Sequence, residues 1–188
     1  MLEDLVLKNR SYRRFQEEVS VAEETLKGLV DLARNTASAA NLQPLKYVLS
    51  CDSEKNALIF SHLFWAAYLK DWSGPSEGER PSAYIVIVGD KGICGSFGCD
   101  HGIAAQTIML GAIEKGLGGC MIGSIGRQSL HKDLALSPDH EILLVLAIGK
   151  PKETVVIESL GATQDIRYWR DSKGVHHVPK RSLGDIMI

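Results

Sequence analysis

The spacing of apolar residues predicts several helices. Ser20-Val21-Ala22-Glu23 has the pattern of a capping box, and apolar residues follow it at intervals of three and four, so we expect a helix that ends near Asn35. Helical patterns also cover residues 54–69, 100–115 and 126–134, with a short opening helix expected over 2–7. The aromatic stripe within 54–69 is more typical of a core or a dimer interface than of a binding wall.

Three apolar runs, 46–51, 83–88 and 141–148, have the length and composition of buried strands. The run 83–88 alternates little, which predicts a central strand covered on both faces. Between the elements, residues 71–82 are rich in Ser, Gly, Pro and charge, and we expect a surface loop or lid there. This order of elements predicts a mixed fold of helices and strands, but it leaves the strand directions open.

A stretch of small and polar residues, 36–44, joins the first long helix to the first strand. Small side chains allow a backbone to approach a ligand closely, and Asn41 and Gln43 each offer a carboxamide that suits the edge of a heterocycle. We expect Pro44 to hold Gln43 in an extended conformation. An ordinary turn between a helix and a strand has a similar composition and is the alternative interpretation.

Composition and charge narrow the function classes. The chain has 188 residues, which fits one domain over 1–188, and its 21 Lys and Arg against 23 Asp and Glu give a net charge of −2. This balance offers no electrostatic argument for nucleic acid or a membrane surface. The first residues lack a basic region followed by an apolar core, so we expect a cytoplasmic protein with no signal peptide.

The chain has four cysteines, which we expect to be reduced thiols: Cys51, Cys94, Cys99 and Cys120. Cys94, Cys99 and His101 have a loose C-x4-C-x-H spacing without a clear fourth ligand. Zinc and iron–sulfur sites need a fuller ligand set, so we expect no metal.

Basic residues occur near both ends of the chain. Arg10 and Arg13 are three residues apart and can face one side of a helical turn, with the hydroxyl of Ser11 between them. Arginine forks bind phosphate bidentately, although a solvated basic face is the commoner fate of such a run. Lys180 and Arg181 form a second basic pair, either in a solvated tail or in one whose apolar side needs burial.

Three motifs together resemble the FMN-dependent nitroreductase family. Residues 10–15 match its N-terminal R-S-x-R-x-F, with Asn9 in place of a preceding Arg, and residues 36–45 match its loop A-P-S-A-x-N-x-Q-P-W, with Ala37 and Leu45 replacing the first Pro and the aromatic residue. The third motif, D-x-G-x-A-x-Q-x-x-x-L-x-A followed by G-L-G-x-x-x-I-G, matches between Asp100 and Gly123.

This resemblance implies an α+β fold, with a mostly antiparallel central sheet flanked by helices. It also implies a homodimer that holds two FMN molecules at its interface, with a domain-swapped C-terminal extension, residues 160–188, wrapping the partner subunit. The phosphate would be bound by Arg10, Ser11, Arg13, Lys180 and Arg181. The flavin ring would be lined by Ser38, Ala39, Asn41 and Gln43 on one side, and by the backbone of Met121, Ile122 and Gly123 beside N5.

The activity implied is an NAD(P)H-dependent, ping-pong reduction of nitroaromatics, quinones or similar acceptors, with NADH or NADPH as the co-substrate. Flavin N5 would carry the chemistry, so no catalytic side chain is expected. Two alternatives keep the flavin: a specialised flavoenzyme such as a reductive dehalogenase or a flavin-cleaving oxygenase, and a non-catalytic FMN-binding or storage module. A third is a metal-binding regulatory protein that uses Cys94, Cys99 and His101.

Overall fold

A four-stranded antiparallel sheet forms the centre of the protein. The computed structural model describes residues 1–161 and 164–188. The strand order is β1-β2-β4-β3, and every neighbouring pair is antiparallel. The strands are β1 (Leu45–Ser50), β2 (Ala83–Asp90), β3 (Gly118–Ile122) and β4 (His140–Gly149). The expected mostly antiparallel α+β fold is therefore confirmed.

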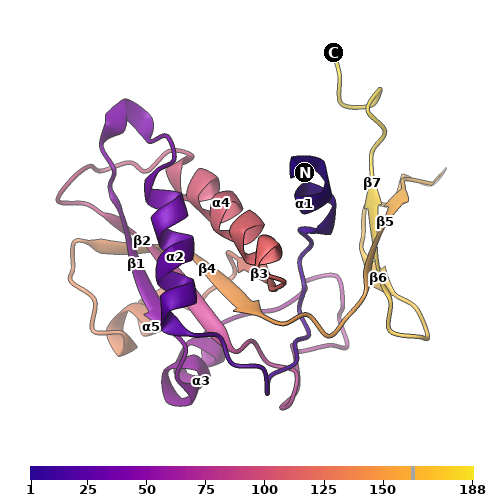
Figure 1. The fold of residues 1–188 in the computed structure, drawn as a ribbon, viewed down its shortest axis with the longest axis horizontal. Coiled ribbons are helices and arrows are strands. Elements are labelled where there is room, and N and C mark those ends of the chain that lie inside the picture. The colour runs from indigo at the N-terminus through magenta and orange to yellow at the C-terminus, as the bar shows by residue number, and fades with distance from the viewer. Residues whose placement is uncertain (162–163) are drawn as a thin grey trace.

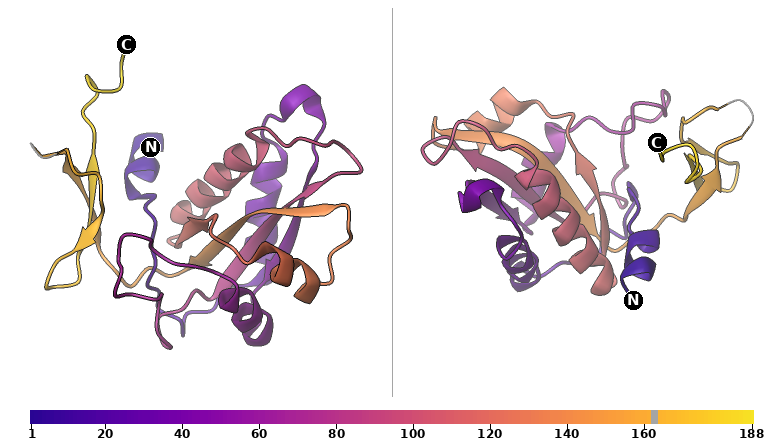
Figure 2. Two further views of the ribbon diagram at one scale, coloured as in Figure 1. Left: turned by 180° about the vertical axis from the view of Figure 1, so that it is seen from behind. Right: turned by 90° about the horizontal axis from the view of Figure 1, so that it is seen from above.

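Helices cover both faces of this sheet. On one face, α2 (Glu23–Arg34) and α4 (Asp100–Glu114) pack side by side over the strands (Figure 1). The two helices approach closely at Gly111, where an added Cβ would lie 2.9 Å from the Leu29 side chain. On the other face lie α3 (Ser53–Ser61) and α5 (Arg127–Asp133), and Figure 2 shows these layers from behind and from above.

The strand β2 is buried on both faces, as its apolar run predicts. Its side chains alternate between two hydrophobic clusters: Ile85 and Ile87 pack with α2 and α4, while Val86 and Val88 pack with the residues around α3 and α5. Burying this continuous apolar run on both sides fixes the sheet between the two helical layers.

A second, smaller sheet lies at the C-terminal end of the chain. Its order is β5-β7-β6, with β5 and β7 parallel and β6 and β7 antiparallel. The strands are β5 (Val155–Ser159), β6 (Trp169–Arg170) and β7 (His176–Lys180). The sheet stands beyond the N-terminal helix α1 (Leu2–Lys8), and the chain end extends past it (Figure 1). Exchange of this tail between subunits stays a prediction.

The helix expected over 54–69 is too long, because α3 ends at Ser61. Beyond it, Leu63 forms a bridge with Ile125, and the Phe64 amide donates to the Ser124 carbonyl over 3.0 Å. This pairing turns the buried Trp65 back into the core, where its ring centroid lies 5.9 Å from that of Phe60. Tertiary pairing therefore overrides the local helical pattern.

Over the residues that the structure describes, no helix has both the length and the apolar character needed to cross a membrane.

Candidate flavin site

The N-terminal segment and the C-terminal sheet together line a hollow of about 260 Å³. The segment runs beside β3, because the Tyr12 amide donates to the Gly119 carbonyl over 2.9 Å. The hollow brings together four of the expected phosphate residues: Arg10, Ser11, Arg13 and Lys180. Arg181 does not line this hollow; it lines the neighbouring one, which shares Lys180 with it and also includes Asp185.

The basic side chains of this hollow form no ion pair with the carboxylates that the structure describes. Within residues 1–161 and 164–188, no ion pair involves Arg10, Arg13 or Lys180. Arg10 donates from Nη2 to the Val6 carbonyl over 2.7 Å, while its buried Nε has no hydrogen-bond partner among these residues. Three cations and the Ser11 hydroxyl therefore surround a space that suits an anion.

Arg13 is held in place by residues of the C-terminal segment. Its Nη1 lies 3.1 Å from Nε2 of His176, and its guanidinium lies 4.6 Å from the centroid of the Tyr168 ring. Burial, and then the nearby charge of Arg13, lowers the pKa of His176 to about 4. The imidazole is therefore neutral at pH 7 and accepts the Arg13 hydrogen bond at Nε2, which leaves the proton on Nδ1.

A buried carboxylate supports the backbone of the same segment. Glu153 accepts hydrogen bonds from the backbone amides of Arg13 and Arg14, and it pairs with Arg170 over 2.8 Å. The three family motifs do not include Glu153, Tyr168 or His176. Adjacent histidines at 176 and 177 in an extended segment were the only local hint.

A second cavity, of about 230 Å³, shares Arg13 with the phosphate hollow. Met121, Ile122 and Gly123 line it, so the structure brings the expected close-approach turn next to the expected phosphate site. A Cβ added at Gly123 would meet nothing within 4 Å, which shows that open space borders this backbone. Trp65 also lines the cavity, and its buried Nε1 has no hydrogen-bond partner in the described part of the chain.

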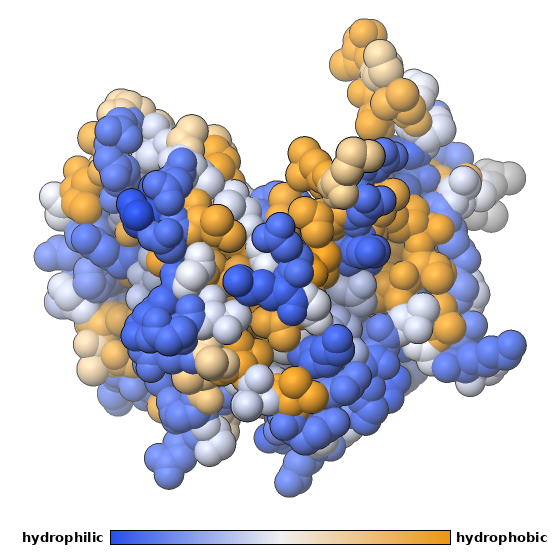
Figure 3. Space-filling view, in the orientation of Figure 1, coloured by the Kyte–Doolittle hydropathy of each residue, from blue (hydrophilic) through white to orange (hydrophobic). Residues whose placement is uncertain are grey.

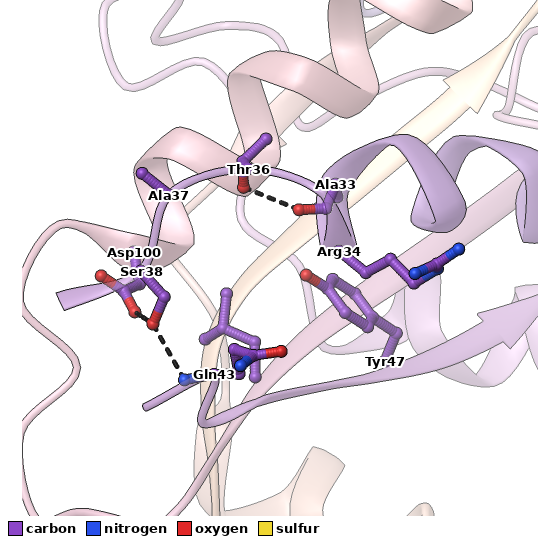
Figure 4. A pocket seen from close by; sticks show the side chains of 9 residues that line it. Ala33, Arg34, Thr36, Ala37, Ser38, Gln43, Tyr47 and Asp100 are labelled. Atoms are coloured by element: carbon purple, nitrogen blue, oxygen red, sulfur yellow. Dashed lines mark hydrogen bonds between the residues drawn. The ribbon is translucent and has the colours of Figure 1, made fainter. Parts of the chain in front are cut away.

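The loop with the two carboxamides lines a third cavity, of about 170 Å³ (Figure 4). Ser38 and Gln43 face it, whereas Ala39 and Asn41 are exposed outside it. The loop is anchored by the buried Asp100, which accepts from Ser38 Oγ over 2.5 Å and from the Ala39 amide over 3.1 Å. Asp100 belonged to the third motif, but sequence reasoning did not recognise it as an anchor.

The expectation of an extended Gln43 is wrong. Its φ is 52°, and Ala40 and Asn41 have φ of 48° and 55°. Asparagine adopts this left-handed region more readily than most residues, so the other two positions carry strain. Two hydrogen bonds hold the conformation, from the Gln43 amide to Ser38 Oγ (2.9 Å) and from Gln43 Nε2 to the Asn41 carbonyl (3.1 Å).

The loop and the phosphate hollow lie toward opposite ends of α4 in one chain. Asp100 is the first residue of this 15-residue helix, whereas Ser11 pairs with Gly119, beyond its last residue. A helix of this length spans roughly 22 Å. The loop cavity shares no lining residue with either of the other two cavities.

The expected lid is fixed to the body of the protein at Glu79. This carboxylate pairs with Arg14 (2.5 Å) and Lys152 (3.2 Å), and the Arg14 hydrogen bond lowers its pKa to about 2. Residues of 71–82 line none of the three cavities above, and a lid role stays a prediction.

The described ranges contain no group of three His, Cys, Asp or Glu side chains placed to hold a metal ion.

Comparison with known proteins identifies the family. The sequence profile of the Nitroreductase family matches residues 6–90 and 98–150. The chain belongs to the nitroreductase family. Membership of this family supports an oxidoreductase activity for the chain. The matched ranges include Arg10, Ser38 and Gly123, but β5, β6 and β7 lie outside them, together with Tyr168 and His176.

Solved structures share the fold, and two of the three described below carry nitroreductase names. A nitroreductase family protein from Clostridium novyi NT has 16% identity and a TM-score of 0.67, and the match covers 100% of this chain and 99% of that one. An FMN-dependent nitroreductase from Clostridium difficile R20291 has 23% identity and a TM-score of 0.64, covering 79% and 86%. CLA-ER, an enone reductase, has 19% identity and a TM-score of 0.66, covering 80% and 89%. The search of curated proteins finds no match.

Proposed function

We propose that this nitroreductase-family protein is an FMN-dependent oxidoreductase that uses NADH or NADPH to reduce nitroaromatics, quinones or similar acceptors. One observation carries the proposal: Arg10, Arg13 and Lys180 meet in a hollow without a carboxylate partner, and Arg13 joins that hollow to the cavity along Met121–Gly123. A flavin mononucleotide has a phosphate for the first space and a flat ring for the second. The FMN-dependent nitroreductase from Clostridium difficile, which has the same fold, is consistent with this choice.

The residues present fit the phosphate of FMN. Within residues 1–161 and 164–188, the buried Nε of Arg10 and Nδ1 of His176 have no hydrogen-bond partner, and both residues line the hollow. An N–H group left unpartnered by burial is satisfied when an anion accepts from it. When bound, FMN supplies the hydride chemistry at N5, and the chain supplies binding and orientation.

The roles of the chain's own residues follow from their positions. Arg10, Ser11, Arg13 and Lys180 would hold the phosphate. The open backbone at Gly123 would let the ring approach, because a Cβ there would meet no described atom within 4 Å. The buried Cys120 beside this cavity has a thiol pKa raised by burial, so it remains a protonated thiol rather than a nucleophile.

We further propose a homodimer in which each flavin is held by both chains. The Ser38–Gln43 loop lies toward the far end of α4 from the phosphate hollow, so a second copy would supply it to the ring. Two exposed apolar surfaces are available for such an interface. One is the protruding C-terminal segment (Figure 3), where Leu183 is 69% and Met187 68% exposed, and the other is α1 with Leu2 and Leu7.

The first experiment is an absorption spectrum of the purified protein, followed by anaerobic addition of NADH and then NADPH. A flavin spectrum that bleaches with a reduced nucleotide, and recovers with a nitroaromatic, a quinone or an enone, supports the oxidoreductase and ranks its acceptors. A flavin spectrum that bleaches with neither nucleotide favours the FMN-binding module. A colourless protein that cannot be reconstituted with FMN contradicts both.

Mixing two variants, each of which lacks one part of the proposed site, tests whether two chains share that site. Arg10→Ala with Arg13→Ala removes the phosphate contacts, and Asn41→Ala with Gln43→Ala removes the carboxamides. In a mixed two-fold dimer, one of the two sites would combine the unchanged phosphate residues of one chain with the unchanged loop of the other. About half of the dimers are mixed after random association, so about a quarter of all sites would be restored. Recovered FMN binding after co-refolding supports sharing, whereas no recovery places the whole site in one chain.

A further inference from the structure

A cavity of about 250 Å³ lies where β2 begins and the first turns of α3 pass over it. Its lining shares no residue with the three cavities of the candidate flavin site. Arg80 and Ser82, which precede β2, and Tyr84, its second residue, line it, and Phe60 lines it from α3. This space is therefore separate from the proposed FMN site.

Three polar groups that line this cavity have no hydrogen-bond partner among the described residues: the Tyr84 hydroxyl, Ser82 Oγ and Arg80 Nε. Tyr84 is 1% and Ser82 9% exposed, so bulk water does not reach these hydroxyls freely. Most buried polar side-chain atoms in native proteins have a partner, and an unpartnered group calls for an explanation such as a bound molecule. Three such groups at one cavity point to a ligand.

Two other polar residues of the lining, Asn56 and Glu17, already make hydrogen bonds within the described chain. Asn56 accepts from Ser50 Oγ over 2.7 Å and donates to the Ser82 carbonyl over 2.8 Å. Glu17 accepts at Oε2 from the backbone amides of Gly78 (2.6 Å) and Arg80 (3.1 Å). The buried groups without a described partner are therefore the Arg80 guanidinium nitrogen Nε and the hydroxyls of Ser82 and Tyr84, all of which can donate, and the hydroxyls of Ser20 and Ser53 also line the cavity.

Arg80 supplies an oriented positive charge. Its guanidinium lies 4.6 Å from the centroid of the Phe60 ring, which leaves the edge of the fork free for hydrogen bonding. In the described parts of the chain, no carboxylate forms an ion pair with it. Burial raises the pKa of Tyr84 far above its usual value, so the hydroxyl keeps its proton at neutral pH.

We propose that this cavity binds a small monocarboxylate. The two oxygens of a carboxylate match the arginine fork and leave acceptor sites for the hydroxyls of Ser82 and Tyr84. The body of the ligand would lie against Phe60. The Glu17 carboxylate lines the same cavity, so a ligand with a single negative charge fits better than a phosphate dianion. The proposal does not depend on the proposed oxidoreductase function.

The test is calorimetric titration of the purified whole chain with benzoate, using benzamide and inorganic phosphate as matched probes. We expect one saturable site for benzoate, with weaker binding of both other probes. Arg80→Gln should weaken benzoate binding at least about tenfold, since it removes a charge-assisted pair. Tyr84→Phe should weaken it several-fold without lowering the urea midpoint, because it removes a hydroxyl that has no partner.

Two control variants separate this site from the flavin site. Lys132→Gln changes a cation outside the cavities described above, and it should bind benzoate as the wild type does. Arg10→Ala with Arg13→Ala should also bind benzoate normally, even if it loses FMN. Benzoate binding that survives Arg80→Gln, or that perturbs a flavin spectrum, places the ligand elsewhere and overturns the proposal. The proposal is also overturned if benzamide or phosphate binds as tightly as benzoate, or if benzoate does not bind.

Discussion

Nη1 of Arg13 lies 3.1 Å from Nε2 of His176, and this contact joins the N-terminal segment to β7 at the candidate phosphate site. Both residues are buried, with 9% and 1% of their surface exposed. Among the described residues, neither hydrophobic cluster includes a residue of β5, β6 or β7. Polar contacts around Arg13 therefore contribute to the docking of the C-terminal sheet, which makes the docking sensitive to charge.

Stability should fall as the pH drops from about 6.5 to about 4. The unfolded chain protonates His176 near its ordinary pKa, 6.5, whereas the folded protein holds that pKa at about 4. Between these values the unfolded state binds more protons, so acidification lowers the free energy of unfolding. The loss reaches at most about 3 kcal/mol, since one pKa unit corresponds to 1.36 kcal/mol.

Urea denaturation without added FMN, at pH 7 and pH 4.5, checks this expectation. His176→Gln keeps an acceptor for Arg13 but does not titrate, so it should flatten the pH dependence in this window. The matched control is His131→Gln in α5, away from the C-terminal sheet, which should leave the dependence unchanged. An equal pH dependence in wild type and His176→Gln would show that another group is responsible.

Breaking the buried pair between Glu153 and Arg170 should be costly. The Glu153 side chain is 0% and that of Arg170 15% exposed, and the carboxylate also accepts two backbone amides. Glu153→Gln leaves the Arg170 charge without its partner, and we expect a loss of about 3 kcal/mol in the free energy of unfolding. Removing the second charge as well, with Arg170→Met, should recover part of this loss.

The exposed pair of Asp165 and Arg167 provides the control for that experiment. Its N–O distance is 2.6 Å, yet the side chains are 42% and 68% exposed. Solvent screens such pairs, so Asp165→Asn should change the urea midpoint much less than Glu153→Gln does. Similar midpoints for the two variants would contradict a structural role for Glu153.

Sequence patterns predicted the parts of the fold that depend on local periodicity. The apolar run at 83–88 identified β2, and the helical spacing from Leu26 to Ala33 identified α2 with Asn35 at its end. The motifs also predicted that Arg10, Arg13 and Lys180 would meet, and the structure brings them to one hollow. In each case the information lies in short spacings or in the resemblance to a family.

The features that the sequence did not predict depend on contacts between distant segments. The end of α3 at Ser61 follows from the pairing of Leu63 with Ile125, which no local pattern encodes. The left-handed Gln43 depends on the Ser38 hydroxyl, itself held by Asp100 62 residues away in sequence. His176 reaches Arg13 across 163 positions, and it lies outside the part of the chain that matches the family.

Two glycines of the Gly118–Gly123 segment should respond differently to alanine. A Cβ at Gly119 would lie 2.2 Å from the Ala147 carbonyl oxygen, so Gly119→Ala forces β3 away from β4 and should cost about 3 kcal/mol of stability. Gly123→Ala meets nothing within 4 Å and should leave the urea midpoint unchanged. Because the flavin is proposed to approach this backbone, Gly123→Ala should still weaken FMN binding, measured by flavin fluorescence. Unchanged FMN affinity would indicate that the flavin ring does not lie beside Gly123.

Asp100→Ala should release the carboxamide loop. It leaves the Ser38 hydroxyl and the Ala39 amide without their acceptor, and such a loss costs about 2 kcal/mol. The strained Ala40 and Gln43 would then relax, because the hydrogen bonds that hold their positive φ are weakened. We therefore expect a lower urea midpoint together with weaker FMN binding.

The matched control is Asp31→Ala on α2, whose exposed carboxylate bonds only to the neighbouring Arg34 in the described structure and should affect neither measurement. If a second copy supplies the loop, Asp100→Ala chains mixed with Arg10→Ala/Arg13→Ala chains should regain FMN binding, since each variant keeps the segment that the other lacks. Asp100→Ala protein with normal FMN affinity would show that this loop, despite its anchor, does not contact the flavin.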